Sequence, residues 1–391
     1  MANDLTFDQI AATLNEINEQ VTGESSLAPV DTSEFITVGQ KLLKTGYDPV
    51  MNALSQVMHK TIYSARNYDE KVDFIRVSNE RYGNHVRKVN YCDKDLTEDV
   101  RYDLTDGESV DQYTVNKPSI IQTNFYGVET YEKMTTLFTD QIDSALSSPD
   151  EFGSFLSGQL SNIDNQLKMT RDTTARMIMA NYMAGKISDD SDNVIHLVTE
   201  FNAENDSEYD SETIMHDDIF PAFVKWLYAR IQTISDLMTE RSYLYHINLT
   251  DANPIPRHTP YANQRMVLLG GYMNKITSQV LASIYHDDKL KLAKYNKVNF
   301  WQSIETPGAI NLAHANVLNP ANFEIKKTGA VSQGNILGII FDEEAMGYTI
   351  VNERTTVTPF NAKGCYYNQY WKGAYRYWND FTENGVVLVL D

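Results

Sequence analysis

The chain has 391 residues, of which 42% are hydrophobic and 22% are charged, a composition that is typical of globular proteins and excludes wholesale disorder. A formal net charge of −20 at pH 7 argues against tight non-specific binding to nucleic acid, because basic residues carry such binding. Two cysteines and the lack of any apolar run of about 18 residues argue against a disulfide-stapled secreted domain and against a membrane span.

The N-terminal region is predicted to be helical and loosely attached. We expect an amphipathic helix over 5–21, where one face carries Leu5, Ile10, Leu14 and Ile17. The polar stretch 22–33 is typical of an arm that needs a partner surface to become ordered. The more apolar segment 35–63 is expected to be helical in part. The acidic and polar start of the sequence predicts no secretory signal.

Residues 71–125 are predicted to form an extended β ribbon. Charged and β-favouring residues alternate in 72–77 and in 85–91, and Gly83 and Gly107 offer turns between the segments. Strands of this composition carry too little apolar surface to fold alone, so the ribbon must lie on another surface. An enzyme lid is one interpretation, but the length of the segment favours an arm that reaches a neighbouring subunit.

The strongest helix signal runs from Ser148 to Gly185. Ser148 is a predicted N-cap, Pro149 occupies the first helical position, and Glu151 completes a capping box. Apolar residues recur at three-and-four spacing along one face, at Phe152, Leu156, Leu160, Ile163, Leu167, Ala175, Ile178 and Tyr182. Gly185 is expected to end the helix, whose length would be roughly 50 Å.

The remainder mixes helices and strands without regular alternation, which favours an α+β fold. Residues 189–213 are expected to form an acidic surface loop, and helices are expected over 218–243 and 274–295. Short buried strands are predicted at 265–270, 336–341, 348–351 and 386–390. In the aromatic segment 363–378, a base-stacking platform is less consistent with the acidic chain than the packed face of a sheet, formed by Tyr366, Tyr370, Tyr377 and Trp378. Cys92 and Cys365 are expected to be small buried groups.

Motifs for catalysis or metal binding are almost absent from the sequence. Two near-repeats, His216-Asp217-Asp218 and His286-Asp287-Asp288, offer imidazole and carboxylate ligands for a transition metal. Adjacent residues on a helix point in different directions, however, and an aspartate at a helix start is commonly a cap. We therefore expect no catalytic residue, no cofactor and no metal. A metal-dependent hydrolase or transferase with the ribbon as its lid stays the alternative.

The order of these elements resembles the major capsid proteins of tailed double-stranded DNA bacteriophages, which have the Hong Kong 97-like capsid fold. Three stretches carry the resemblance: the helix over 149–186, the strand entry over 257–269, and the segment 358–371 followed by the closing strand 384–388. The plan is also similar to that of the short-tailed group that includes the Bacillus protein-primed phages.

The resemblance implies a division of the chain into an N-terminal arm, an extended loop, a peripheral domain and an axial domain. Residues 1–35 would be the arm and 71–125 the extended loop. The peripheral domain would comprise 36–70, 126–186 and 361–391, with a spine helix over 149–185, and the axial domain would comprise 187–360.

The function implied is that of a subunit which assembles with itself, as pentamers and hexamers, into an icosahedral shell around phage DNA. The candidate inter-subunit residues are Arg76, Arg81, Arg87, Lys88 and Tyr91. The other implied partners are a separate scaffolding protein and a portal, and the DNA would be enclosed without sequence-specific binding. The chain would act in the virion after assembly in the host cytoplasm, with no membrane contact and no covalent crosslink. Another virion protein, such as a portal, stays open.

Overall fold

The computed structural model describes residues 7–23, 32–62, 70–77, 86–92, 99, 103–110, 113, 115, 117, 119–189, 193–247, 255–280, 295–313, 317–318, 325–327 and 329–391. The chain forms two compact units, each built from separate stretches of sequence. Unit 1 comprises Met1–Gly83, Val128–Ala175 and Tyr348–Arg376, and unit 2 comprises Asn84–Gly127, Arg176–Gly347 and Tyr377–Asp391. The long helix α5 (Pro149–Asp189) begins in unit 1 and ends in unit 2.

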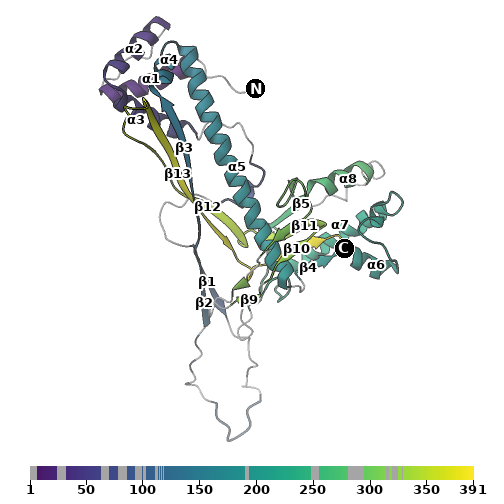
Figure 1. Cartoon of the computed structure of the whole chain (residues 1–391). Helices are drawn as coiled ribbons and strands as arrows, with labels where there is room; N and C mark the ends of the chain where they lie inside the picture. The colour runs from purple at the N-terminus through teal and green to yellow at the C-terminus, as the bar shows by residue number, and fades with distance from the viewer. Residues whose placement is uncertain are drawn as a thin grey trace. The chain divides into compact units, whose positions relative to one another are not determined.

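Unit 1 contains a group of helices around the N-terminal end of α5 (Figure 1). They are α1 (Phe7–Thr22), α2 (Thr32–Lys44), α3 (Tyr47–Ile62) and α4 (Thr139–Ala145). The helix predicted from the N-terminal spacing is confirmed, because Ile10, Leu14 and Ile17 are buried in the core of this unit. The N-cap of α5 is confirmed as well, since the backbone N–H of Glu151 donates to Ser148 Oγ at 3.2 Å.

The sheet of unit 1 has the strand order β12 (Met346–Val357), β13 (Tyr366–Asn379), β3 (Gly127–Phe138), and it runs alongside the first part of α5 (Figure 1). Over 366–375, strand β13 alternates between half-buried and buried residues, and Tyr367, Trp371 and Tyr375 are its buried aromatic residues. The predicted packed face was therefore wrong, because Tyr366, Tyr370, Tyr377 and Trp378 are only half-buried. Aromatic residues stand on both faces of this strand, so hydrophobicity alone does not select the inner one.

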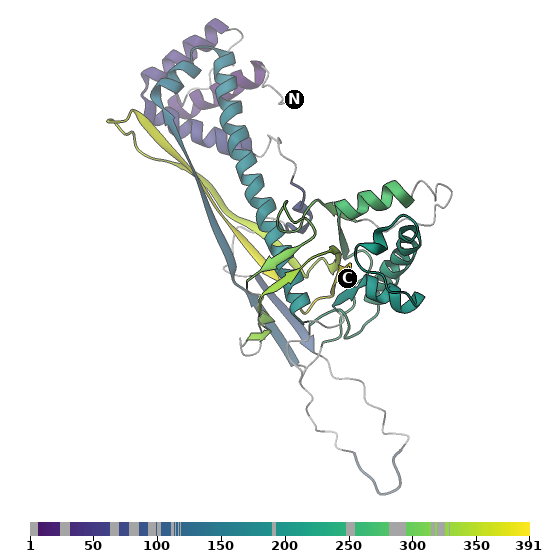
Figure 2. The same ribbon diagram turned by 45° about the vertical axis from the view of Figure 1, so that its right-hand side comes forward.

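Unit 2 is built on a buried sheet with the strand order β4 (Val194–His196), β14 (Gly385–Val389), β11 (Ile336–Asp342), β5 (Gln264–Leu269), β6 (Asn296–Val298). The central pairs β14–β11 and β11–β5 are antiparallel, and the edge strands β4 and β6 pair in parallel. Helices α6 (Leu197–Asn205), α7 (Phe220–Thr239) and α8 (Gly270–Val280) gather beside this sheet (Figure 1 and Figure 2). This mixed helix and sheet architecture confirms the α+β prediction.

Smaller elements complete unit 2. Strands β7 (Ile310–Leu312) and β10 (Val331–Gln333) pair with each other, as do β8 (Val317–Leu318) and β9 (Ile325–Lys327). A two-stranded ribbon consists of β1 (Val86–Cys92) and β2 (Ser119–Phe125). A single 3-10 turn, η3 (Thr213–Met215), precedes α7. Among the described residues, no helix is both long and apolar enough to cross a membrane.

Several predicted boundaries were wrong. The predicted strand over 72–77 is a 3-10 turn, η1 (Asp73–Ile75), and Gly185 does not end α5, which continues to Asp189. The loop predicted over 189–213 contains β4 and α6, because apolar residues such as Leu197 and Phe201 bury against the sheet. Helix α7 stops at Thr239, short of the predicted end, and the predicted helix over 274–295 starts earlier, at Gly270. Its last part, 281–294, lies outside the described residues.

Candidate inter-subunit surface on the β1–β2 ribbon

The β1–β2 ribbon has two chemically different faces. Its strands pair without interruption from Val86 opposite Phe125 to Cys92 opposite Ser119. Successive side chains of a strand point to opposite faces, so Lys88 and Asn90 share one face of β1 and Arg87, Val89 and Tyr91 share the other. The first face is buried or half-buried, whereas the second is exposed.

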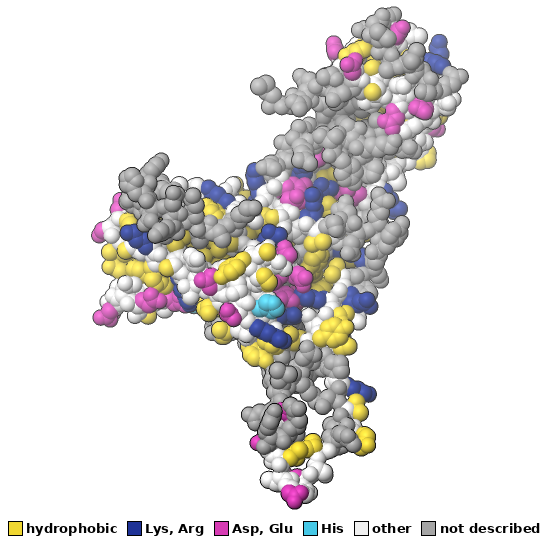
Figure 3. All heavy atoms as spheres, turned by 180° about the vertical axis from the view of Figure 1, so that it is seen from behind, with side chains coloured by type: hydrophobic (Ala, Val, Ile, Leu, Met, Phe, Trp, Pro, Cys, Tyr) yellow, Lys and Arg dark blue, Asp and Glu magenta, His cyan; other side chains and the backbone are white. Residues whose placement is uncertain are grey.

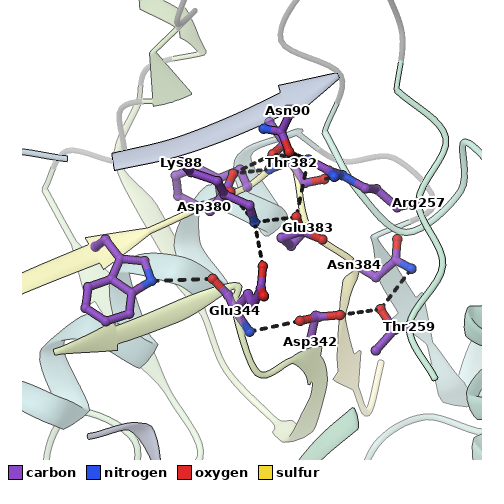
Figure 4. A network of polar contacts seen from close by, with 12 residues as sticks. Lys88, Asn90, Arg257, Thr259, Asp342, Glu344, Asp380, Thr382, Glu383 and Asn384 are labelled. Carbon is purple, nitrogen blue, oxygen red and sulfur yellow. Dashed lines mark hydrogen bonds and ion pairs between the residues drawn. The ribbon is translucent and has the colours of Figure 1, made fainter. Parts of the chain in front are cut away.

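The inward face is bound to the rest of unit 2 through Lys88 (Figure 4). Its Nζ is 3.0 Å from Asp380 Oδ2 and 3.3 Å from Glu344 Oε2, and it donates a hydrogen bond to Glu383 Oε1. Only 19% of the Lys88 side chain is exposed, and Asp380 and Glu383 are more deeply buried at 4% and 8%. Glu344 is 66% exposed, so the buried pairs with Asp380 and Glu383 are the ones that hold the strand.

A second cation, Arg257, completes the cluster (Figure 4). Its Nη2 lies 3.2 Å from Glu383 Oε1 and donates to Asn90 Oδ1 at 3.0 Å, so it contacts the ribbon as well. Its Nε donates to the carbonyl oxygen of Thr382 at 3.0 Å. Thr382 in turn donates from its hydroxyl to Asp380 Oδ1 at 2.6 Å. The turn between β13 and β14 thus provides both anions and fixes their direction.

The carboxylates of this cluster keep Lys88 charged. Burial alone would lower the pKa of Lys88, but the carboxylates of Asp380 and Glu383 outweigh it and raise the pKa above its ordinary value. Burial raises the pKa of Glu383, although Lys88 and Arg257 partly oppose that shift. Lys88 is therefore a charged ammonium at neutral pH, and it stabilises the charged forms of Asp380 and Glu383.

The outward face presents apolar side chains to solvent. Tyr91 is 64% exposed and stands directly opposite Ile120, which is 55% exposed, and Val89 on the same face is 42% exposed. Opposite residues on one face of an antiparallel pair lie about 5 Å apart at Cβ, so these side chains form one continuous strip. An exposed strip of this kind on an otherwise acidic protein is typical of an interaction surface.

The connection between β1 and β2 carries further exposed apolar side chains. Among its described residues, Leu104 is 45% exposed, Val110 51%, Tyr113 81% and Val115 75%. Figure 3 shows hydrophobic and acidic side chains together on this loop. The described residues of the connection therefore add exposed apolar side chains to those of the ribbon.

The structure sorts the predicted interface residues. Arg87 and Tyr91 lie on the outward face, and Lys88 is paired within its own unit. Arg76 belongs to unit 1, where it pairs with Asp73 at 2.9 Å and Glu70 at 3.8 Å. Arg81 lies outside the described residues. Sequence reasoning missed Ile120, although strand alternation could have placed it beside Tyr91, and it missed the turn 380–384, which no motif marks.

Each unit contains a further buried polar cluster. In unit 2, Lys186 has no exposed surface, and its Nζ donates to carbonyl oxygens of Tyr245 at 3.0 Å and Glu383 at 3.2 Å and to Asn193 Oδ1 at 3.2 Å. In unit 1, Arg171 Nη2 donates to Glu353 Oε1 at 2.7 Å. The same oxygen also accepts a hydrogen bond from the Tyr131 hydroxyl at 2.5 Å.

Metal ligands do not converge among the described residues: no group of three or more His, Cys, Asp or Glu side chains is placed to hold an ion. His216-Asp217-Asp218 lies just before α7, and His286-Asp287-Asp288 lies outside the described residues. Cys365 was expected to be buried but is exposed, in a turn where its φ of 49° is left-handed. The side chain of Cys92 is not described.

The fold has counterparts among solved phage capsids. The structure is similar to one from the capsid of Staphylococcus phage Andhra, with a TM-score of 0.53 at 9% identity, covering 82% of this chain and 84% of that chain. It also matches the capsid of Cyanophage P-SCSP1u with a TM-score of 0.44 at 11% identity, covering 81% of this chain and 86% of that chain. At 9% identity, the similarity to the Andhra capsid shows the fold and nothing more. This fold is that of Hong Kong 97-like capsid proteins.

The sequence itself assigns the family. None of the curated proteins compared with it matches. Residues 10–389 match the family described as Phi29-like phage major capsid protein, which is nearly the whole chain. The chain therefore belongs to the Phi29-like phage major capsid protein family, and it is a structural subunit of the capsid shell of a phage virion.

Proposed function

We propose that this subunit assembles into the shell through the outward face of its β1–β2 ribbon, with Arg87, Val89, Tyr91 and Ile120 in contact with a second copy. The observation that supports this proposal is the exposed pair of Tyr91 and Ile120 on a ribbon whose other face is bound to its own unit. Tyrosine and arginine are enriched at protein interfaces, because each combines a large contact area with a polar group.

Weak contacts of this kind suffice for a shell. A contact with a dissociation constant of about 1 mM is worth about 4 kcal/mol, and a subunit that touches several neighbours at once gains from multivalency. Weak single contacts also let misplaced subunits leave. The subunit would form pentamers and hexamers, together with a separate scaffolding protein and a portal, during assembly in the host cytoplasm.

The remaining parts of the proposal concern anatomy and chemistry. Residues 71–125 would be the extended loop, 149–185 the spine helix of the peripheral domain, and 187–360 the axial domain, with an N-terminal arm over 1–35. The subunit would carry no enzymatic activity and would enclose double-stranded DNA without reading its sequence. Its net charge of −20 supports weak contact with the packaged genome.

Charged substitutions on the outward face test the proposal. The assembly of purified Tyr91→Asp and Ile120→Asp proteins is followed by light scattering and negative-stain microscopy, alongside the wild type. Ile304→Asp is the matched control, because Ile304 is 75% exposed and lies outside the ribbon. We expect wild type and control to form shells or curved sheets while both ribbon variants stay dispersed and folded. Shells formed by the ribbon variants at the wild-type rate would refute the proposed surface, as would equal loss of assembly by the control.

A further inference from the structure

The turn that anchors the ribbon is held within unit 2 by several backbone hydrogen bonds. The turn 380–384, which binds Lys88, is tied to other loops by backbone hydrogen bonds: Asp380 N–H donates to Ala345 O and Gly385 N–H donates to Tyr245 O, both at 2.7 Å. Ile247 N–H donates to Phe381 O, and Asp342 N–H donates to Asn384 O, each at 2.9 Å. These hydrogen bonds restrict the backbone of the residues whose carboxylates face Lys88.

The same turn is also tied to α5. Lys186 Nζ donates to the carbonyl oxygen of Glu383 at 3.2 Å and to that of Phe381 at 3.5 Å, and the ring of Phe381 stacks on Tyr182 at 5.4 Å. The backbone of the turn therefore binds the helix while its side chains bind the ribbon. Lys88 connects the two-stranded ribbon, an element that is at best marginally stable by itself, to this fixed point.

The outward direction of Tyr91 follows from that connection. Lys88 and Asn90 are drawn toward Asp380, Glu383 and Arg257, and strand alternation then turns the neighbouring side chains to solvent. Without the ion pairs, little would favour the observed orientation of the two-stranded ribbon, because burial of its exposed apolar strip would itself be favourable.

We propose that Lys88 is a positioning residue for shell assembly: its ion pairs with Asp380 and Glu383 hold the ribbon of the free subunit in the orientation that offers Tyr91 and Ile120 to a second copy. The effect of Lys88 on the ribbon is a property of the free subunit. Its consequence for assembly rests on the proposed function of the outward face.

Hydrogen–deuterium exchange of the dilute, unassembled full chain tests the proposal. In Lys88→Met the aliphatic stem remains but the charge is lost, and we expect backbone amides of Val86–Cys92 and Ser119–Phe125 to exchange roughly tenfold faster than in the wild type. Arg87→Met is the matched control, because Arg87 precedes Lys88 on the same strand and faces outward. Ribbon exchange is expected to be unchanged in the control, and protection of the core strand β14 is expected to be unchanged in both proteins.

The outcomes separate the two proposals. Faster ribbon exchange together with slower assembly of Lys88→Met, whose outward face is intact, supports the positioning role. Unchanged ribbon exchange in Lys88→Met, or an equal increase in Arg87→Met, overturns it even if Tyr91→Asp abolishes assembly. Faster ribbon exchange in Lys88→Met, combined with shell formation by Tyr91→Asp and Ile120→Asp at the wild-type rate, would support the effect of Lys88 on the ribbon and refute the proposed function. Should Lys88→Met lose β14 protection, Asn90→Ala replaces it, with an expected increase of about threefold, and no increase would overturn the proposal.

Discussion

Gly185 of α5 lies against the aromatic ring of Phe381, so closely that a Cβ at this position would overlap the ring. Phe381 stacks on Tyr182, one turn earlier on the same helix, with ring centroids 5.4 Å apart and planes inclined by 8°. The sequence pattern predicts that Gly185 ends the helix, but the helix continues to Asp189. Gly185 makes room for the turn that carries the anions of the ribbon cluster.

Replacement of this glycine is expected to weaken unit 2. Gly185→Ala should lower the free energy of unfolding by about 1–3 kcal/mol, because the added methyl group forces the ring of Phe381 to move in a close-packed region. Gly158→Ala on the same helix is the control, since its Cβ would meet no atom within 4 Å, and it should raise stability by about 0.5–1 kcal/mol. Urea unfolding of dilute subunits measures both changes. Equal effects of the two substitutions would contradict this account of the packing.

The buried ammonium of Lys186 predicts an unusual pH dependence. Burial lowers its pKa from 10.5 to about 7, although Asp380, Asp189 and Glu383 oppose the shift. Between these values the unfolded chain binds a proton that the folded chain has lost, so stability should rise with pH from 7 toward 10.5. Over the whole window this contribution amounts to at most roughly 5 kcal/mol.

The variant Lys186→Met tests whether stability rises with pH because of Lys186. The free energy of unfolding of the wild type, measured between pH 7 and 9.5, should increase more steeply with pH than that of the variant. The comparison of slopes removes contributions from other titrating groups that the two proteins share. A variant with the same slope as the wild type would show that Lys186 keeps its proton throughout this range.

The Arg171 cluster of unit 1 is expected to be sensitive to loss of its cation. Arg171→Met leaves Glu353 and Glu70, whose side chains are 13% and 10% exposed, without their buried partner, and should cost about 3–5 kcal/mol at pH 7. Lys372→Met is the control, because Lys372 and Glu132 are 41% and 49% exposed, and it should cost at most about 1 kcal/mol.

The loss caused by Arg171→Met should shrink in mild acid. Burial raises the pKa of Glu70, while Arg171 opposes this shift, so removal of the arginine raises the pKa further. A carboxyl whose pKa is higher in the folded state than in the unfolded chain takes up its proton preferentially in the folded state as the pH falls. The difference in unfolding free energy between wild type and variant should therefore be smaller at pH 5 than at pH 7. A difference that grows on acidification would contradict the assignment of Arg171 as the counter-ion of Glu70.

The elements with strong periodicity could be predicted from the sequence. The spacing of Ile10, Leu14 and Ile17 and the capping residue Ser148 identify their helices, because amphipathic spacing and capping are local signals. Strand β1 could be predicted because its residues alternate. The burial register of β13 could not, since Tyr366 and Tyr367 are both aromatic and only tertiary packing decides which one turns inward.

The candidate surface could be predicted only in part. Arg87 and Tyr91 are among the candidates that were expected on the ribbon 71–125, and in the structure they share its exposed face. The partners of Lys88 could not be identified, because Glu383 is separated from it by 295 residues and neither position belongs to a motif. A charge on a strand says nothing about whether its partner lies in the same chain or in a neighbouring subunit.

The orientation of the ribbon in an assembled shell tests the central claim most directly. A cryo-electron microscopy reconstruction of particles formed by the wild-type protein would show the environment of Tyr91 and Ile120. We expect both side chains to be buried against a second copy of the chain while Lys88 keeps its contacts with Asp380 and Glu383. Shells in which Tyr91 and Ile120 face solvent, or particles that are closed rings rather than shells, would contradict the account.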